Sequence, residues 1–154
     1  MGELNLKGKV AVVTGASQGL GEALAIRLDK EGCKVAVCDF NIEGAKAVAA
    51  KLKEAIAIPV DVTNYEQCET MAKTVLDKWG KVDILVSNAG IVKSGDIYNL
   101  TPAMFAAVTN VNLNGYFNVV KAFAPSMLER KSGSIIQINS KSGRKGSFKN
   151  GAYA

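Results

Sequence analysis

The sequence contains no histidine. Catalytic systems built on a histidine base, such as Ser-His-Asp and Cys-His arrangements, are therefore excluded, and any proton transfer falls to Tyr, Lys, Asp or Glu. Zinc sites that need histidine are excluded on the same ground. The three cysteines, Cys33, Cys38 and Cys68, are odd in number and form no C-x-x-C pair. We therefore expect reduced, structural thiols and no bound metal.

Long apolar runs are also absent from the sequence. No stretch approaches the roughly 18 uninterrupted apolar residues that a membrane span requires, and the N-terminus carries no apolar targeting segment. We therefore expect a cytoplasmic protein without a membrane anchor. With 154 residues, of which 48% are hydrophobic, the chain has the length and composition of one domain with a substantial core.

Positive charge is concentrated toward one end of the chain. The net formal charge is +5, and the residues from 121 onward carry seven Lys or Arg against Glu129 alone, so the first 120 residues are slightly acidic. A surplus confined to one end argues against a nucleic-acid-binding face and favours a local anion site. The sequence also lacks the interleaved aromatic and basic residues of nucleic-acid binders.

The most informative stretch is T-G-A-S-Q-G-L-G over residues 14–21, which follows an apolar run over residues 10–13. This order predicts a strand, a glycine turn and a helix over about residues 20–30. Glycine at 15, 19 and 21 permits positive φ and lets a ligand approach the main chain closely. Free N–H groups at a helix start attract phosphate, so we expect a pyrophosphate here. Such glycines also build ordinary turns and caps.

Strand and helix patterns alternate along the rest of the chain. Further strands are predicted over residues 34–38, 55–60, 82–87 and 134–139, and further helices over residues 43–54, about 64–79 and about 102–130. The alternation predicts an α/β fold of Rossmann type, which is a doubly wound parallel sheet with helices on both faces. Pro59 lacks the N–H that a central strand donates, so the strand over residues 55–60 belongs at a sheet edge. Thr63 and Glu66 have the spacing of a capping box for a helix that ends at Gly80.

Two polar positions stand out against this pattern. Asp39 ends the second strand, 24 residues after Gly15. An acid at this point is placed to bind the ribose hydroxyls of adenosine and to repel the 2′-phosphate of NADP, so we expect NAD as the cofactor. A cap for the next helix is the alternative role. N-V-N-L-N-G over residues 110–115 has poor helix propensity inside a helical stretch, a conflict that indicates function.

Taken together, these motifs resemble the short-chain dehydrogenase/reductase family. The resemblance rests on residues 14–21, Asp39, Asp61-Val62, N-A-G over residues 88–90, the 110–115 motif, Ser140 and Tyr153, and it covers residues 1–154 as a single NAD-binding domain. It implies catalytic roles for Asn112, Ser140 and Tyr153. It also implies cofactor contacts by Gly15, Ser17, Gln18, Gly19, Leu20, Gly21, Asp39, Phe40, Asp61, Val62, Asn88, Ala89 and Gly90, although Asn88 could be a turn residue.

In that family, the tyrosine exchanges a proton with the substrate oxygen, the serine holds this oxygen, and the asparagine positions water for a proton relay. A lysine four residues after the tyrosine supports the proton exchange. Here it would fall at position 157, beyond Ala154. The helix that carries the lysine and the last two strands would also follow Ala154. The resemblance therefore implies the N-terminal piece of a longer enzyme, with little activity of its own.

The substrate is indicated by I-I-Q-I-N-S-K-S-G over residues 135–143. This stretch is similar to the sorbitol-6-phosphate 2-dehydrogenase branch of the family, which interconverts sorbitol 6-phosphate and fructose 6-phosphate with NAD. Lys141, Arg144 and Lys145 flank Ser140 and could bind a substrate phosphate. The alternative for Arg144, Lys145 and Lys149 is a solvated loop without a ligand.

Two other functions are left open by the sequence. One is an NAD-dependent dehydrogenase of an uncharged polyol or other secondary alcohol, and the other is a truncated NAD-binding module without catalysis. Family members commonly assemble through the long helices beside the active site. We therefore expect a homodimer or homotetramer formed through the helix over residues 102–130, with or without a separate C-terminal segment of the same protein.

Overall fold

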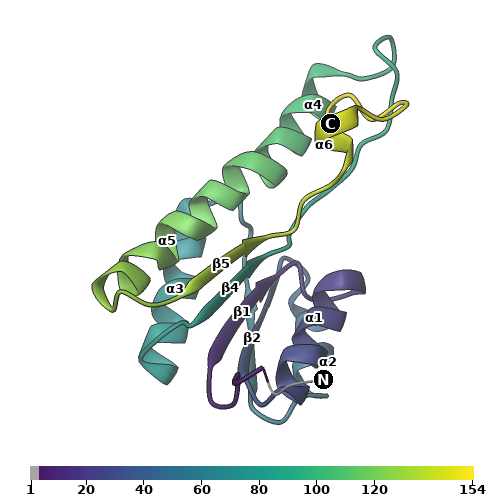
Figure 1. Ribbon diagram of the computed structural model, residues 1–154. Helices are drawn as coiled ribbons and strands as arrows, with labels where there is room; N and C mark the ends of the chain where they lie inside the picture. The colour runs from purple at the N-terminus through teal and green to yellow at the C-terminus, as the bar shows by residue number, and fades with distance from the viewer. Residues whose placement is uncertain (1–3) are drawn as a thin grey trace.

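The computed structural model describes residues 4–154 and contains one parallel sheet covered by helices (Figure 1). The sheet has the strand order β3-β2-β1-β4-β5, and every neighbouring pair is parallel. Its strands are β1 (Val10–Thr14), β2 (Lys34–Asp39), β3 (Ala55–Pro59), β4 (Ile84–Ser87) and β5 (Ser134–Gln137). The predicted Rossmann-type α/β fold is confirmed.

The helices alternate with these strands along the chain. They are α1 (Gly19–Lys30), α2 (Ile42–Ala49), α3 (Tyr65–Trp79), α4 (Pro102–Thr109), α5 (Gly115–Glu129) and α6 (Ser142–Lys145), and a π-helical segment, η1 (Asn110–Asn114), joins α4 to α5. Among residues 4–154, none of these helices combines the length and the apolar character of a membrane span.

Alternating side chains of the central strand divide the core between two faces of the sheet. Val10 and Val12 of β1 pack in the cluster that includes residues of α3 and α5, whereas Ala11 and Val13 pack in the cluster that includes residues of α1 and α2. Figure 1 shows α1 and α2 on one side of the sheet and α3 and α5 on the other. This division follows from the two-residue period of a strand, whose successive side chains point to opposite faces.

The two edges of the sheet differ. Pro59 lies in the edge strand β3, as predicted. At the other edge, all four residues of β5 are exposed, including Ile135 and Ile136. The cysteines are free and buried, as expected for structural thiols.

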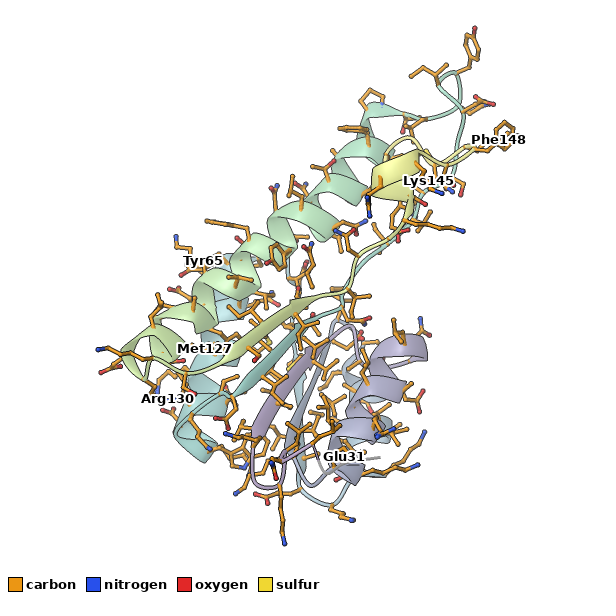
Figure 2. All side chains as sticks on the ribbon, viewed as in Figure 1. Glu31, Tyr65, Met127, Arg130, Lys145 and Phe148 are labelled. Carbon is orange, nitrogen blue, oxygen red and sulfur yellow. The ribbon has the colours of Figure 1, made fainter. Side chains whose placement is uncertain are left out.

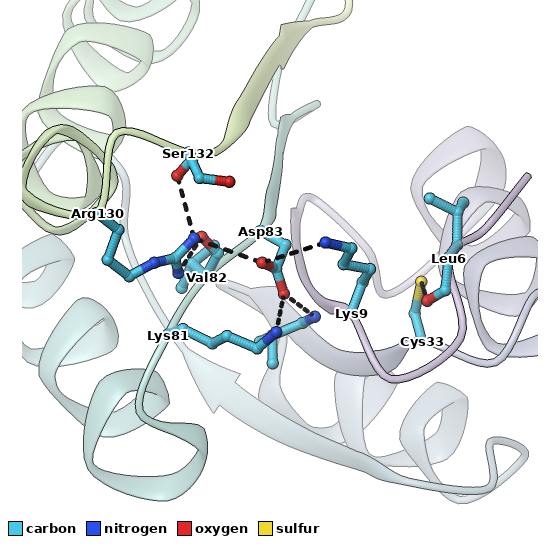
Figure 3. Close-up of polar contacts among 9 residues, drawn as sticks. Leu6, Lys9, Cys33, Lys81, Val82, Asp83, Arg130 and Ser132 are labelled. Carbon is cyan, nitrogen blue, oxygen red and sulfur yellow. Dashed lines mark hydrogen bonds and ion pairs between the residues drawn. The ribbon is translucent and has the colours of Figure 1, made fainter.

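Asp83 joins several elements at the amino ends of the strands (Figure 3). Its carboxylate accepts the Val10 N–H at 2.9 Å and lies 2.9 Å from Lys81 Nζ and 3.4 Å from Arg130 Nη2. Arg130 also donates to the carbonyl of Val82. One buried carboxylate therefore links β1, the start of β4 and the end of α5.

Several predicted boundaries are wrong. Helix α2 ends at Ala49 rather than Glu54, since the Lys53 N–H donates to the Asp29 carboxylate at 2.8 Å. Helix α3 is capped by Asn64 in place of the predicted Thr63–Glu66 box, since the Thr63 hydroxyl donates to Asp61 instead. The fourth and fifth strands are each two residues shorter than predicted, and the predicted loop after Ser140 contains the short helix α6.

Candidate active site

A pocket of about 620 Å³ lies at the carboxyl end of the sheet. The chain runs outward from β1 through β2 to β3 and then returns to place β4 on the other side of β1. Ligands of open α/β sheets bind at such a switch point. The lining residues are Gly15, Ser17, Gln18, Gly19, Leu20, Asp39, Phe40, Val60, Asp61, Val62, Thr63, Asn88, Ala89, Gly90, Ile91 and Val111.

This lining contains every predicted cofactor residue except Gly21. Gly21 is buried, and a Cβ at this position would collide with the Gly15 carbonyl oxygen and the Asn88 side chain. Its role is therefore to let α1 pack against the glycine turn. Gly15 and Gly19 have φ of +63° and +59°, which is the left-handed region that favours glycine. Gln18 forms no side-chain cap at the start of α1, so the first amides of this helix are not satisfied by a cap.

Asn88 attaches the glycine turn to β4. Its side-chain amide donates to the carbonyl oxygens of Thr14 and Gly15 at 3.1 and 3.0 Å. In return, the Thr14 hydroxyl accepts the N–H groups of Asn88 and Ala89 at 3.1 and 3.2 Å. The Asn88 amide nitrogen and the Thr14 hydroxyl oxygen therefore both hold the turn in place. Thr14 was not predicted as a functional residue, although it immediately precedes the first glycine.

Asp39 borders the pocket from the end of β2. Its carboxylate accepts the Ser17 N–H at 2.9 Å and the Asn41 N–H at 2.8 Å. Helix α2 is capped by the side chain of Asn41. Asp39 is therefore not the cap of this helix. A carboxylate has about four lone-pair sites, so two backbone donors leave acceptor capacity on Asp39 for a ligand.

Asp61 and Val62 form the turn after β3. The Asp61 carboxylate accepts the N–H and the hydroxyl of Thr63 at 2.9 and 2.7 Å. The Asp61 N–H donates to the Gln67 side chain at 2.8 Å, and the Val62 carbonyl accepts the Asn118 side chain at 3.0 Å. Contacts from two helices therefore fix this turn at the edge of the pocket.

The asparagine-rich motif forms the π-helical segment η1. Its backbone hydrogen bonds span five residues, one more than those of the flanking α-helices. Asn112 lies at its centre. The side chain of Asn112 accepts the Ile91 N–H at 2.8 Å and donates to the Ile91 carbonyl at 2.9 Å. The side-chain amide is thus paired with the backbone that follows β4, and Gly90 lies close beside it.

A second pocket of about 270 Å³ adjoins the first, because Asn88, Ala89 and Gly90 line both. Asn112 and Tyr153 line this second pocket, together with Ser87, Val92, Tyr116, Gln137, Ile138 and Asn139. Ser140 directly follows this lining, is partly buried, and accepts the Ser142 N–H on its hydroxyl at 3.2 Å. The structure therefore brings Asn112 and Tyr153 to one pocket, with Ser140 next to its rim.

The three predicted phosphate-binding cations lie outside both pockets. Lys141 is the residue before α6, and Arg144 and Lys145 are in its last turn. All three are exposed, and Figure 2 shows Lys145 on this short helix near the end of the chain. The structure does not bring these side chains together with Tyr153 in either pocket.

Several lining residues were not predicted. Val60, Thr63 and Ile91 adjoin predicted residues at the strand ends, so their position in the strand pattern could have identified them. Val111 lies within the asparagine-rich motif over residues 110–115, which the sequence marks as unusual without identifying this residue. Tyr116 directly follows that motif, and the sequence gives no local signal for it.

The pockets fit a dinucleotide. Helix α1 begins at the first pocket without a side-chain cap, and the space where Gly19 would carry a Cβ is open. The carboxylates of Asp39 and Asp61 also line this pocket. A volume of about 620 Å³ falls within the usual range for small-molecule and cofactor sites. Asp39 and Asp61 would hold the adenosine half, and the glycine turn would hold the pyrophosphate.

Comparison with known proteins agrees with this geometry. The family described as short chain dehydrogenase matches residues 9–154. The chain is 35% identical over 152 residues to a sorbitol dehydrogenase of Cereibacter sphaeroides, covering 97% of this chain and 59% of that protein. It is 41% identical over 143 residues to an acetoacetyl-CoA reductase of Synechocystis sp., covering 93% of this chain and 57% of that protein.

Among solved structures, the crystal structure of gox2181 matches with a TM-score of 0.92 and 32% sequence identity. The match covers 98% of this chain and 62% of that one. The chain therefore spans less than two thirds of the length of these relatives.

Proposed function

Because the chain belongs to the short-chain dehydrogenase/reductase family, we propose that the protein containing it transfers a hydride between NAD and a secondary alcohol of a polyol. The observation that carries this proposal is the pair of adjoining pockets, one with the glycine turn and Asp39, the other with Asn112 and Tyr153. A dinucleotide extended across both would have its adenosine half near Asp39 and its reactive ring near Tyr153. The bound cofactor would supply the hydride acceptor or donor.

The residues of the second pocket support an acid–base role for Tyr153. Its phenol would exchange a proton with the substrate oxygen, since the chain contains no histidine. The Ser140 hydroxyl would donate a hydrogen bond to the same oxygen and so orient the carbon that reacts. Asn112 would keep the wall of the pocket in place through its two hydrogen bonds to Ile91. A lysine at position 157, if the reading frame continues, would complete the proton path.

A polyol is favoured by the polar lining of the second pocket. Ser87, Tyr116, Gln137 and Asn139 offer hydroxyl and amide groups, which suit a substrate rich in hydroxyls. The similarity to a sorbitol dehydrogenase supports the same substrate class. The similarity to an acetoacetyl-CoA reductase favours a second candidate, the reduction of a 3-oxoacyl group.

We propose further that the polyol substrate carries a phosphate, as sorbitol 6-phosphate does. Its support is the run of cations after Ser140, namely Lys141, Arg144 and Lys145, which follow the site directly in sequence. They would reach a phosphate at the mouth of the second pocket by extending from α6.

The test is a rate comparison with the intact protein and NAD. We expect NADH formation with sorbitol or sorbitol 6-phosphate, and none with a Tyr153→Phe variant that still binds NAD. Faster turnover of the phosphorylated substrate, lost on replacing Lys141, Arg144 and Lys145 with alanine, would support the phosphate site. Equal rates would leave an uncharged polyol as the substrate. Binding of NAD without any turnover would favour a non-catalytic module.

We further propose that the protein is a homodimer or homotetramer in the cytoplasm. Phe105, Leu113 and Phe117 are exposed apolar side chains along α4, η1 and α5. Exposed apolar surface of this kind is typical of protein interfaces. Light scattering on the intact protein gives the mass directly, and a Phe117→Glu variant is expected to lower it.

A further inference from the structure

The turn formed by Asp61 and Val62 is held from outside the pocket by two side-chain amides. Gln67 of α3 accepts the Asp61 N–H at 2.8 Å, and Asn118 of α5 donates to the Val62 carbonyl at 3.0 Å. Neither Gln67 nor Asn118 lines the pocket, whereas Asp61 and Val62 do. The two amides can therefore influence a ligand only through this turn.

Helix α5 approaches the turn unusually closely. Gly115 is buried at the start of α5, and a Cβ there would stand 2.6 Å from Cγ2 of Val62. Asn118 lies three residues later and so presents its side chain on the same face of the helix. The close approach at Gly115 brings the Asn118 amide within hydrogen-bond distance of the Val62 carbonyl.

The Val62 carbonyl has one weaker alternative donor. The Cys68 thiol lies 3.7 Å from the same oxygen. Burial, with a smaller effect of the Asp61 charge, raises the pKa of the Cys68 thiol to about 11, so the thiol keeps its proton at neutral pH. A thiol is a weak donor. Without the Asn118 amide, the carbonyl of buried Val62 would therefore keep only a weak hydrogen bond from the Cys68 thiol.

The continuous helix formed by η1 and α5 also contacts the backbone that follows β4. Asn112, in η1, pairs with the backbone of Ile91, and Asn118, in α5, pairs with Val62. Ile91 and Val62 both line the larger pocket. Two asparagines six residues apart thus attach one helix to two walls of that pocket, and only Asn112 also lines the pocket of Tyr153.

We propose that Asn118 is a positioning residue for the adenosine half of the dinucleotide, acting through the Val62 carbonyl. This inference rests on the proposed function, since it assumes that the larger pocket binds NAD. Asn118 orders the turn before the ligand arrives, so the ligand does not have to order it. Its loss weakens binding of the adenosine half and leaves the chemistry at Tyr153 unchanged.

Calorimetry on the intact protein tests this with ADP-ribose, which carries the adenosine half without the nicotinamide. Asn118→Ala is expected to weaken ADP-ribose and NAD binding by about three- to tenfold, the worth of one hydrogen bond. The KM for NAD should rise by the same factor, and kcat should stay unchanged. Asn118→Asp, which cannot donate, should match or exceed this loss.

Two further variants keep the test decisive. Asn114→Ala is the matched control, because its amide donates only to exposed Asn110, and it should leave ADP-ribose binding unchanged. Gln67→Ala removes the second support of the turn, the hydrogen bond from the Asp61 N–H, at an exposed position. It should weaken ADP-ribose binding in the same way, and it can be measured even if the Asn118 variants fail to fold. Unchanged ADP-ribose affinity in folded Asn118→Ala, with wild-type binding intact, overturns the inference alone. Failure of the wild-type protein to bind ADP-ribose and NAD overturns the proposed function instead.

Discussion

The side-chain amide of Asn88 donates to the carbonyl oxygen of Gly15 at 3.0 Å, across the point where β1 and β4 diverge. The same amide also donates to the Thr14 carbonyl. Asn88→Ala removes both bonds and is expected to lower the free energy of unfolding by about 1–3 kcal/mol. Because the glycine turn loses its support, NAD affinity should fall as well. Chemical denaturation and calorimetry measure the two effects.

The outcome with Asn88→Asp distinguishes donation from packing. Aspartate has the shape of asparagine but cannot donate when ionised, so it would face the two carbonyl oxygens with a negative charge. We expect a larger loss of stability than with alanine. Wild-type stability and affinity in both variants would contradict the role assigned to this amide.

Gly21 tests the packing of α1 against the turn. A methyl group at this position would overlap the Gly15 carbonyl and the Asn88 side chain. Gly21→Ala should therefore cost about 1–3 kcal/mol of stability, as overpacking generally does. Gly151→Ala is the control, since a Cβ at Gly151 would meet no atom within 4 Å and its φ is not positive. Equal melting temperatures for the two variants would refute the steric account.

The Asp83 cluster predicts a specific loss of stability in acid (Figure 3). Burial by itself would raise the pKa of Asp83, but the Val10 N–H, Lys81 and Lys9 together hold this pKa below its usual value. The folded state therefore favours the ionised form, and the stability from this group is present at neutral pH. It is lost as the pH falls below about 4, through the depressed folded-state pKa.

Asp83→Asn removes this contribution. At neutral pH it should cost about 1.5–3 kcal/mol, the range for hydrogen bonds to a charged group, and the difference from wild type should shrink below about pH 4. Asp77→Asn is the comparison, because Asp77 pairs with Lys73 at an exposed position and should cost less than about 1 kcal/mol. Urea unfolding across this pH range provides the measurement. A difference that stays constant with pH would contradict the assignment.

Asp39 is expected to set the cofactor preference. Its carboxylate lies at the end of β2 beside Ser17 and borders the pocket. Asp39→Ala removes the charge that would repel a 2′-phosphate, so the ratio of NAD to NADP affinity should fall by about tenfold or more. Losing the Ser17 contact should weaken the binding of NAD and NADP by the same factor. The ratio of the two affinities therefore reports only the effect of the Asp39 charge. Glu129→Ala, at the end of α5, should leave the ratio unchanged.

The sequence was sufficient for the features that depend on local chemistry. Pro59 predicted an edge strand because its ring removes a donor, and β3 is at the edge. Gly80 predicted the end of α3, where it has a φ of +73°. The glycine turn, Asp39 and the N-A-G motif predicted residues that line one pocket, because parallel strands bring their carboxyl ends to the same edge.

Tertiary contacts decided what the sequence could not predict. Residues 50–53 are good helix formers, yet α2 ends at Ala49. The backbone N–H of Lys53 bonds instead to the carboxylate of Asp29 in α1. The asparagine-rich motif conflicts with helix propensity, but the sequence does not predict its π-helical form. In the structure its residues lie against segments far away in the chain, since Asn112 bonds to Ile91 and Gly115 packs close to Val62. No local pattern contains those partners.

Titration of the intact protein with NAD in a calorimeter is the decisive measurement for the proposed dinucleotide site. We expect saturable uptake of one NAD per chain, weakened in the Asn88→Ala and Asp39→Ala variants and unchanged in Glu129→Ala. The absence of any uptake by the folded wild-type protein would contradict it.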